Sequence, residues 1–273
     1  MQSGSIIVAG SGISLAHMTM ETRSYIQASD LVLHVVADSV TADWIKQNSR
    51  LSDSMKDYYE LGLDRRQIYS RMVERVLEAA RDGRRVCAVF YGHPGIFVTP
   101  SHEIVERANS EGISVRMLPG ISAEDCLVAD LGFDPGTVGC HAYEATDFLL
   151  YKRVPDVRSW LIVWQPDTVG DIYFSDGVDN GKRIGVLRDY LLEYYGPDDE
   201  AIVYEANTYV VGKPHIERFP LKKLCEVEMT GISTLVIPPT SEGSLDEDMV
   251  NKLSLREPYS GTVTASPEAV STK

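Results

Sequence analysis

Residues 86–95 have the sequence VCAVFYGHPG, and this stretch decides the fold. Its first six residues are apolar or aromatic, which predicts a buried strand, and the two glycines and the proline that follow end the strand abruptly. Residues 5–12 (SIIVAGSG) show the same pattern near the start of the chain, and residues 114–120 (SVRMLPG) show it again further along. We therefore expect three strands, each of which ends in a glycine-containing turn.

Helical patterns lie between these strands. In residues 64–82 one face of the helix is apolar, and Gly83 ends it; the residues on that face are Ile68, Met72, Val76 and Ala80. Further helices are expected over 19–28, 101–109 and 123–130, and one more strand over 31–37. Such an alternation predicts an α/β fold with parallel strands joined by crossover helices.

The second half of the chain alternates less regularly. Strands are expected over 160–164, 201–204 and 233–237, with a helix over 184–195, and this order is typical of a mixed sheet. We expect an N-terminal domain over 1–120, a C-terminal domain over 121–239 and a tail over 240–273. The tail is rich in Ser, Thr, Glu and Pro and contains one short helical candidate, 247–253.

Composition excludes several classes of function. The chain has 273 residues, 44% of them hydrophobic, and a net charge of −14, so it lacks the basic excess that a nucleic-acid backbone or an anionic membrane surface requires. The four cysteines form no C-x-x-C pair, and no metal-ligand spacing occurs. We found no secretory signal and no apolar run of membrane-spanning length, and we therefore predict a cytoplasmic location.

Two loops at strand ends are candidates for ligand binding. Residues 91–95 lie at the carboxyl end of a buried strand, where open α/β sheets bind ligands, and backbone carbonyl groups there would suit a cationic sulfonium. An ordinary strand-to-helix loop explains these residues equally well. Residues 118–124 repeat the arrangement one strand later, although Ser122 could simply cap a helix. The Gly10-x-Gly12 pair has no third glycine at Leu15, so a tight turn explains it at least as well as a ligand does.

A third cluster combines phenols with a guanidinium. Tyr58 and Tyr59 precede the expected helix, and Arg65 and Tyr69 are four residues apart on one of its faces. Aromatic residues in a loop are more often used for packing. An arginine beside a phenol, however, lowers the phenol pKa from about 10, which would make Tyr69 a usable base.

Three motifs resemble those of a known family. Residues 8–12 (VAGSG), 91–95 (YGHPG) and 119–123 (PGISA) resemble the successive motifs of the tetrapyrrole methylases. The usual family form of the second motif is Gly-Asp-Pro, and the histidine in Gly92-His93-Pro94 is the mark of the borosin enzymes that N-methylate peptide backbones. Residues 89–102 and 117–127 are very similar to the omphalotin-type enzyme, and the resemblance extends from about Ser5 to Pro239.

The resemblance implies a tetrapyrrole-methylase-like fold of two α/β domains, one with a parallel sheet and one with a mixed sheet, with S-adenosylmethionine between them and S-adenosylhomocysteine as the product. It implies that Arg65 and Tyr69 are the catalytic pair and that Tyr59 supports them. Tyr58 and Lys56 would contact the substrate, although Lys56 stands where the family has a tyrosine. The implied donor-binding residues are Tyr91, His93, Ile96, Ser122, Ala123, Gln165, Ala206, Ser233 and Thr234.

The expected activity is α-N-methylation of backbone amides in a ribosomally made precursor peptide with a core segment. The resemblance also implies a homodimer. We expect the peptide to act in trans, because residues 240–273 are polar and contain no sustained run rich in Val, Ile and Gly. Alternatives are a corrinoid or porphyrin methylase of the same fold, a self-methylating fused borosin of which only part is present, and a binding module without catalysis.

Overall fold

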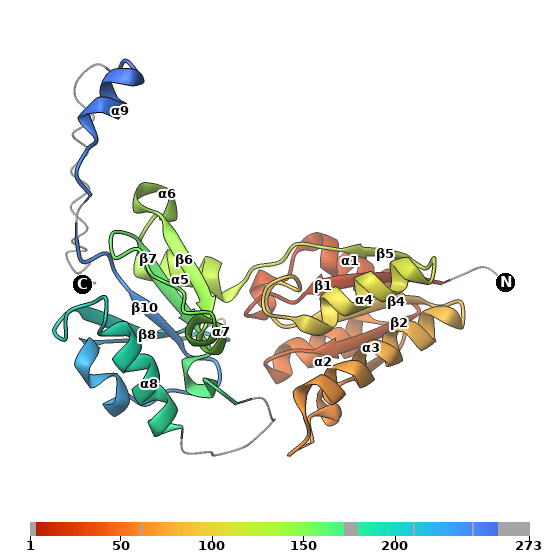
Figure 1. Cartoon of the computed structure of the whole chain (residues 1–273). Helices are drawn as coiled ribbons and strands as arrows, with labels where there is room; N and C mark the ends of the chain where they lie inside the picture. Colours follow the sequence, from red (N-terminus) through yellow and green to blue (C-terminus); the bar gives the residue numbers. More distant parts are fainter. Residues whose placement is uncertain (1–3, 61, 172–179, 210, 242, 256–273) are drawn as a thin grey trace. The chain divides into compact units, whose positions relative to one another are not determined.

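The computed structural model describes residues 4–60, 62–171, 180–209, 211–241 and 243–255 (Figure 1). The chain divides into two compact units, and each is described by itself. The first contains Met1–Leu127, Gly170–Asp179 and Glu205–His215, and the second contains Val128–Val169, Asn180–Tyr204 and Ile216–Lys273. The last part of the expected tail, 256–273, lies outside the described residues.

The first unit is built on a five-stranded parallel sheet with the order β3-β2-β4-β1-β5. Its strands are β1 (Ser5–Gly10), β2 (Leu31–Val35), β3 (Ser52–Ser54), β4 (Arg85–Phe90) and β5 (Ser114–Met117). Its connections are the helices α1 (Met20–Ala28), α2 (Ser39–Asn48), α3 (Arg65–Arg81) and α4 (Thr99–Ser110), and the short 3-10 turns η1 (Leu15–His17) and η2 (Lys56–Tyr58). The predicted parallel α/β arrangement of this half is confirmed.

Alternate strand residues face two separate cores. On one side of the sheet Val86 and Ala88 pack with the buried face of α3 and with Ile104 of α4. On the other side Cys87 and Val89 pack with residues of α1 and α2. Both faces of the sheet are therefore covered by helices, which is why its central strands are apolar throughout.

Polar side chains fix where the helices begin. The side chains of Thr19, Asp38 and Asp64 each accept a hydrogen bond from a backbone N–H in the first turn of α1, α2 and α3. The helix predicted over 64–82 begins and ends within one residue of α3. By contrast α2 was not predicted, because it buries only Thr41 and Ile45 and so has a weak apolar stripe.

The second unit has a mixed sheet with the order β6-β7-β10-β8-β9. Strand β6 pairs parallel to β7, whereas β10 is antiparallel to both β7 and β8. The strands are β6 (Cys140–Glu144), β7 (Trp160–Trp164), β8 (Glu200–Glu205), β9 (His215–Pro220) and β10 (Thr234–Ile237). The helices are α5 (Ala123–Leu131), which begins in the first unit, α6 (Pro135–Val138), α7 (Ala145–Leu150), α8 (Gly181–Leu191) and α9 (Glu247–Lys252), with 3-10 turns η3 (Pro166–Thr168) and η4 (Leu221–Glu226).

The predicted mixed sheet is confirmed, but two of its strands were missed. The first four residues of β9 are exposed and β6 is half-buried, so neither has the continuous apolar run that identified β7, β8 and β10. The helix predicted over 184–195 is placed three to four residues too late, because α8 occupies Gly181–Leu191. Within the described ranges, no helix is long and apolar enough to cross a membrane.

A buried histidine on β2 generates the first prediction. His34 is 7% exposed, and burial lowers its pKa from the ordinary value of 6.5, with the charge of Lys56 adding to the effect and that of Asp53 opposing it. As pH falls through about 6.5 the unfolded chain binds a proton that the folded chain does not. The free energy of unfolding should therefore fall below that pH, by at most about 1.4 kcal/mol for each pH unit.

Chemical denaturation at a series of pH values measures this dependence, and His34→Leu is the comparison. The variant should lose the part of the slope that His34 causes. An identical pH dependence in both proteins would contradict the assignment.

Candidate functional site

Three glycines meet where β1, β4 and β5 end. A methyl group added to Gly10 would lie 2.1 Å from the carbonyl oxygen of Gly92, and one added to Gly120 would lie 3.0 Å from the same oxygen. The loops that follow three strands thus touch backbone to backbone. No residue larger than glycine fits at Gly10 without moving this contact.

Backbone hydrogen bonds join the first two of these loops. The N–H of Gly12 donates to the carbonyl of Gly92 at 3.2 Å, and the N–H of Gly92 donates back to the carbonyl of Gly12 at 3.0 Å. The N–H of Ser11 donates to the carbonyl of Phe90 at 2.8 Å. The Gly10-x-Gly12 pair therefore forms a tight turn, and its hydrogen bonds support the loop after β4.

Two histidines hold the remainder of that loop. The N–H of Gly95 donates to Nδ1 of His93 at 2.9 Å, and Nε2 of His102 lies 3.0 Å from the carbonyl oxygen of Gly95. A methyl group on Gly95 would lie 3.1 Å from the His93 ring. His93 therefore shapes its own loop through Nδ1. His102 was not among the predicted site residues.

Tyr91 follows β4 directly and is half-buried. Its N–H donates to the carbonyl of Val35 at 2.8 Å, which links the loop to the end of β2. Burial raises the pKa of the Tyr91 phenol to about 12, and Cys126 and Asp38 add to that shift. The phenol is therefore neutral at physiological pH.

Ser122 caps α5, which is the commoner of the two roles considered for it. Its hydroxyl accepts from the N–H of Asp125 at 3.2 Å, and its own N–H donates to the Asp125 carboxylate at 2.6 Å. Its hydroxyl also donates to that carboxylate at 2.7 Å. This reciprocal capping box fixes Ala123 as the first residue of α5, and the serine-to-acid spacing could have identified it from sequence.

The phenol and guanidinium cluster lies at the start of α3. Tyr58, Tyr59 and Tyr69 pack against the core of the first sheet, and Arg65 is the first residue of α3. Burial raises the pKa of Tyr59 to about 12, Tyr69 raises it further, and Arg65 lowers it. The structure therefore places Tyr59, Arg65 and Tyr69 within electrostatic reach of one another.

Lys56 lies beside this cluster on the exposed turn η2. Its ammonium donates to the carbonyl of Ala37 at 3.5 Å, so it reaches from the end of β3 to the end of β2. The lysine thus occupies the same edge of the sheet as Tyr58 and Tyr59. Its predicted contact with substrate stays a prediction.

Three predicted donor residues lie together in the second unit. Thr234 pairs with Trp164 and with Tyr204 at the start of β10, and both Ser233 and Thr234 are buried. Gln165 follows Trp164 and adopts a left-handed backbone conformation, φ 57°. Such a conformation is uncommon for a residue other than glycine and often marks a functional position. Ala206 directly follows β8 in the sequence.

No metal site is apparent in the part of the chain that the structure describes. No group of three or more His, Cys, Asp or Glu side chains there could hold an ion. The cysteines described there form no disulfide.

Comparison with known proteins identifies the family. The model of the tetrapyrrole (corrin/porphyrin) methylases matches residues 5–224. The chain is 42% identical over 257 residues to the methyltransferase/ribosomally synthesized cyclic peptide dendrothelin A precursor of Dendrothele bispora, covering 92% of this chain and 61% of that protein. It is 38% identical to the corresponding omphalotin A precursor of Omphalotus olearius, covering 93% and 62%.

A further relative is covered more completely. The methyltransferase/ribosomally synthesized type I borosin cyclic peptide precursor of Coprinopsis marcescibilis is 37% identical, over 97% of this chain and 72% of that protein. The chain spans roughly three-fifths of the length of the dendrothelin A and omphalotin A precursors.

Solved structures confirm the fold. The uroporphyrin-III-C-methyltransferase of Thermus thermophilus is 17% identical with a TM-score of 0.60, covering 93% of this chain and 98% of that one. The form of that enzyme complexed with S-adenosylhomocysteine gives 0.61 at 16% identity, covering 86% and 92%.

The chain belongs to the tetrapyrrole methylase family, and within it to the group of the borosin methyltransferases. The expected family and fold are confirmed.

The glycine contact generates a prediction. Gly10→Ala should force the loops after β1 and β4 apart, because its new methyl group meets a backbone carbonyl that cannot rotate away. We expect a loss of stability of about 1–3 kcal/mol or more, together with weakened donor binding. Thermal unfolding and calorimetric titration of S-adenosylmethionine measure the two effects.

Gly185→Ala is the matched control. In α8 the added methyl group meets only Cys225 Sγ, at 4.0 Å, so alanine should be neutral or stabilise by about 0.5–1 kcal/mol. Wild-type stability and donor affinity in Gly10→Ala would contradict the prediction.

Proposed function

We propose that the chain uses S-adenosylmethionine to N-methylate backbone amides of a ribosomally made peptide. The observation that carries the proposal is its 37–42% identity, over 92–97% of its length, to proteins named as methyltransferases and cyclic peptide precursors. The tetrapyrrole enzymes share the fold at 16–17% identity, which supports no common substrate. The arrangement of Tyr59, Arg65 and Tyr69 adds chemical support.

The chemistry of the acceptor explains why these residues are needed. An amide nitrogen is a poor nucleophile because its lone pair is delocalised into the carbonyl. In the proposed step Tyr69 accepts the N–H proton and the nitrogen forms a bond to the methyl carbon. The sulfonium–methyl bond breaks with its electron pair returning to sulfur, so S-adenosylhomocysteine leaves. Arg65 stabilises the negative charge that develops on the amide oxygen.

The raised pKa of Tyr59 favours one role for this residue. A phenol with a pKa of about 12 stays protonated, so Tyr59 suits the role of a hydrogen-bond donor that orients the amide carbonyl. A second neutral donor beside Arg65 would strengthen the oxyanion contact. Tyr69, which the family resemblance assigns to the catalytic pair, remains the proposed base.

The donor is proposed to contact residues of the first unit, namely Tyr91, His93, Ile96, Ser122, Ala123 and Ala206. The donor-binding roles implied for Gln165, Ser233 and Thr234 stay predictions. The rigid loop after β4 supports this assignment, since a ligand needs a preformed wall. A homodimer and a cytoplasmic location also stay predictions.

We propose further that the peptide is supplied in trans and that residues 240–273 are not the methylated segment. Those residues are rich in Ser, Thr, Glu and Pro, a composition that favours a solvated segment. Intact-mass measurement of the chain alone, and then with a peptide added, tests this directly. Increments of one methyl group on the added peptide alone support it, and increments on the chain without peptide contradict it.

Substitutions of the catalytic pair give the next prediction. Tyr69→Phe removes the proton acceptor and should lower turnover by about 10²–10⁴-fold. Arg65→Lys keeps the charge but loses the planar fork, so it should retain part of the activity that Arg65→Ala loses. Single-turnover mass spectrometry measures the rates, and calorimetry confirms that the donor still binds. Wild-type turnover in both Tyr69→Phe and Arg65→Ala would refute the assignment.

Tyr59→Phe should behave differently. Because the phenol is neutral below about pH 11, its removal should lower turnover without shifting the pH–rate profile between about pH 7 and 10. Rates measured across that range for Tyr59→Phe and wild type test the distinction. A displaced profile would show that Tyr59 itself titrates during the reaction.

A further inference from the structure

A thiol and an imidazole lie next to each other in the first unit. Sγ of Cys126, near the start of α5, is 4.0 Å from Nδ1 of His17, the last residue of η1, although the two residues are 109 positions apart along the chain. An imidazole can take the proton of a thiol, and the thiolate is the nucleophilic form of cysteine. The pair therefore has the composition of a reactive thiol.

Backbone packing fixes the position of His17. A methyl group added to Gly12 would lie 2.3 Å from Cβ of His17, and the N–H of His17 donates to the carbonyl of Ser14 at 2.9 Å. Gly12 in turn exchanges two hydrogen bonds with Gly92. The imidazole is therefore attached to the same turn that supports the loop after β4.

Cys126 also lies close to residues that are proposed to contact the donor. Burial raises the pKa of the Tyr91 phenol, and the nearby Cys126 adds to the shift, so the thiol and the phenol are neighbours. On α5 the N–H of Cys126 donates to the carbonyl of Ser122 at 3.3 Å, and Ala123 is three residues away, a spacing that puts two residues on one helix face. A group attached to the Cys126 sulfur would therefore enter the region proposed for the donor.

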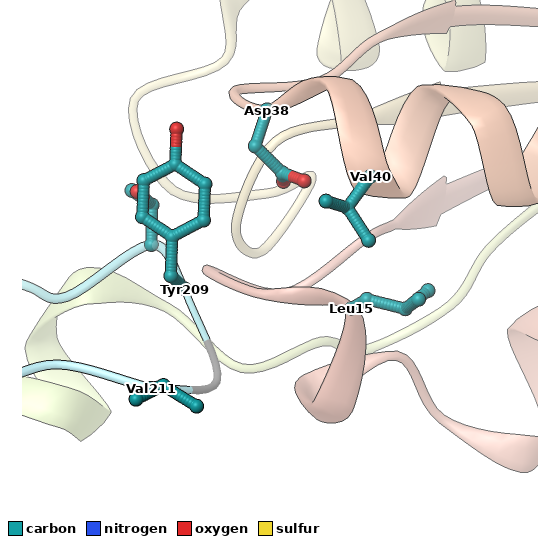
Figure 2. Close-up of a pocket in the computed structure, with 6 residues that line it drawn as sticks. Leu15, Asp38, Val40, Tyr209 and Val211 are labelled. Carbon is teal, nitrogen blue, oxygen red and sulfur yellow. The ribbon is translucent and has the colours of Figure 1, made fainter.

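A pocket of about 360 Å³ at the end of β2 borders the same elements. Its lining includes Leu15, which shares η1 with His17, and Asp38, whose charge reaches Tyr91. Figure 2 shows Leu15 and Val40 on one side of the pocket and Tyr209 on the other. The remaining described lining residues are Thr208 and Val211. A pocket of this volume admits a small organic molecule, so a reagent has room beside the thiol cluster.

The other cysteines have different surroundings. Cys87 is buried in β4, and burial raises its pKa to about 12, so it stays a thiol. The thiol of Cys140 donates to the carbonyl oxygen of His141 at 3.9 Å, an acceptor that cannot take the proton away. Cys225 is exposed in the second unit, where Nη1 of Arg188 donates to its sulfur at 3.4 Å. Cys225 therefore provides an accessible comparison thiol on the same chain.

We propose that Cys126 is a modification site for small neutral or cationic disulfides, and that thiolation of Cys126 blocks binding of the methyl donor. The net charge of −14, and Asp38 in the lining of the pocket, select against an anionic disulfide. The modification site goes beyond the proposed function, while its effect on the donor rests on the donor site proposed there.

The reaction is a thiol–disulfide exchange. His17 takes the proton of the Cys126 thiol, and the thiolate sulfur forms a bond to one sulfur of the disulfide. The original S–S bond breaks with its electron pair on the other sulfur, which leaves as a thiolate and receives the proton from His17. The Cys126 sulfur is oxidised and the departing sulfur is reduced, so a small thiol in excess reverses the step.

Peptide mapping by mass spectrometry, after brief exposure of the full chain to the cationic disulfide cystamine, tests the site. Cys126 should be thiolated about 10-fold faster than Cys140 or more, and Cys87 should stay unmodified. His17→Gln keeps the Cβ that packs on Gly12 but cannot take the proton. It should slow the reaction at Cys126 about 10-fold or more, and leave the rate at Cys225 unchanged. A rate at Cys126 no higher than that at Cys140, or one that His17→Gln does not lower, would overturn the proposal.

Calorimetric titration of S-adenosylmethionine tests the consequence for the donor. Cystamine treatment should weaken donor binding to the wild type about 10-fold or more, because a site that encloses its ligand has no room for a second group, and reduction should restore it. Cys126→Ser should bind the donor as the wild type does and lose the sensitivity to cystamine. Cys225→Ser is the matched control and should keep that sensitivity.

Donor protection supplies an independent readout. Saturating S-adenosylmethionine should slow thiolation of Cys126 but not of Cys225. Wild-type donor affinity in the chain thiolated at Cys126, or equal rates with and without donor, would overturn the proposal and leave the proposed function standing. Failure of the untreated chain to bind S-adenosylmethionine would count against the proposed function, and the rates in wild type and His17→Gln would still decide whether Cys126 is a modification site.

Discussion

The first unit depends on the close approach of Gly10, Gly92 and Gly120. These residues end or follow three parallel strands, and at Gly10 an added methyl group would lie 2.1 Å from a backbone oxygen. Parallel strands send their carboxyl ends to one edge, so loops there compete for space. Because glycine has no Cβ, the backbones of these loops can pack directly against one another. The side chains that follow can then face outward.

The consequences of that packing extend along each loop. The Gly12–Gly92 hydrogen bonds fix the start of the loop after β4, so Tyr91 and His93 have defined positions. His93 Nδ1 accepts a hydrogen bond from the N–H of Gly95, and this bond orients the ring. The loop is ordered when the protein folds. A ligand that binds to these groups therefore does not have to supply the conformational entropy lost in ordering them.

The sequence predicted the elements that are apolar and periodic. Strands β1, β4 and β7 and helix α3 were found because burial on both faces, or on one broad stripe, leaves a strong pattern. Strand β3, which reads Ser-Asp-Ser, lies at the edge of the sheet and has no such pattern. Its three residues form a strand because they pair with β2. That pairing depends on the tertiary structure and leaves no pattern in the local sequence.

Part of the candidate site could likewise be predicted from the sequence, and part could not. Glycine and proline punctuation located the loops after β1, β4 and β5, because backbone geometry depends on residue type. It could not reveal that Asp38 borders a pocket with Tyr209, since the two residues are 171 positions apart along the chain. It also missed the contact of His102 with Gly95, because a histidine seven residues away carries no signal of which atom it contacts. The resemblance to a family supplied residue roles, and the structure supplies their surroundings.

The structure changes the role that spacing suggested for Arg65. Spacing suggested that Arg65 serves one phenol, Tyr69, four residues away on α3. The guanidinium also acts on Tyr59, where burial outweighs it and the phenol pKa rises to about 12. The cation therefore lies within electrostatic reach of a partly buried phenol, Tyr59, which keeps its proton at physiological pH. A phenol that burial keeps protonated cannot take the proton of the substrate, so the proton acceptor of the cluster has to be another group.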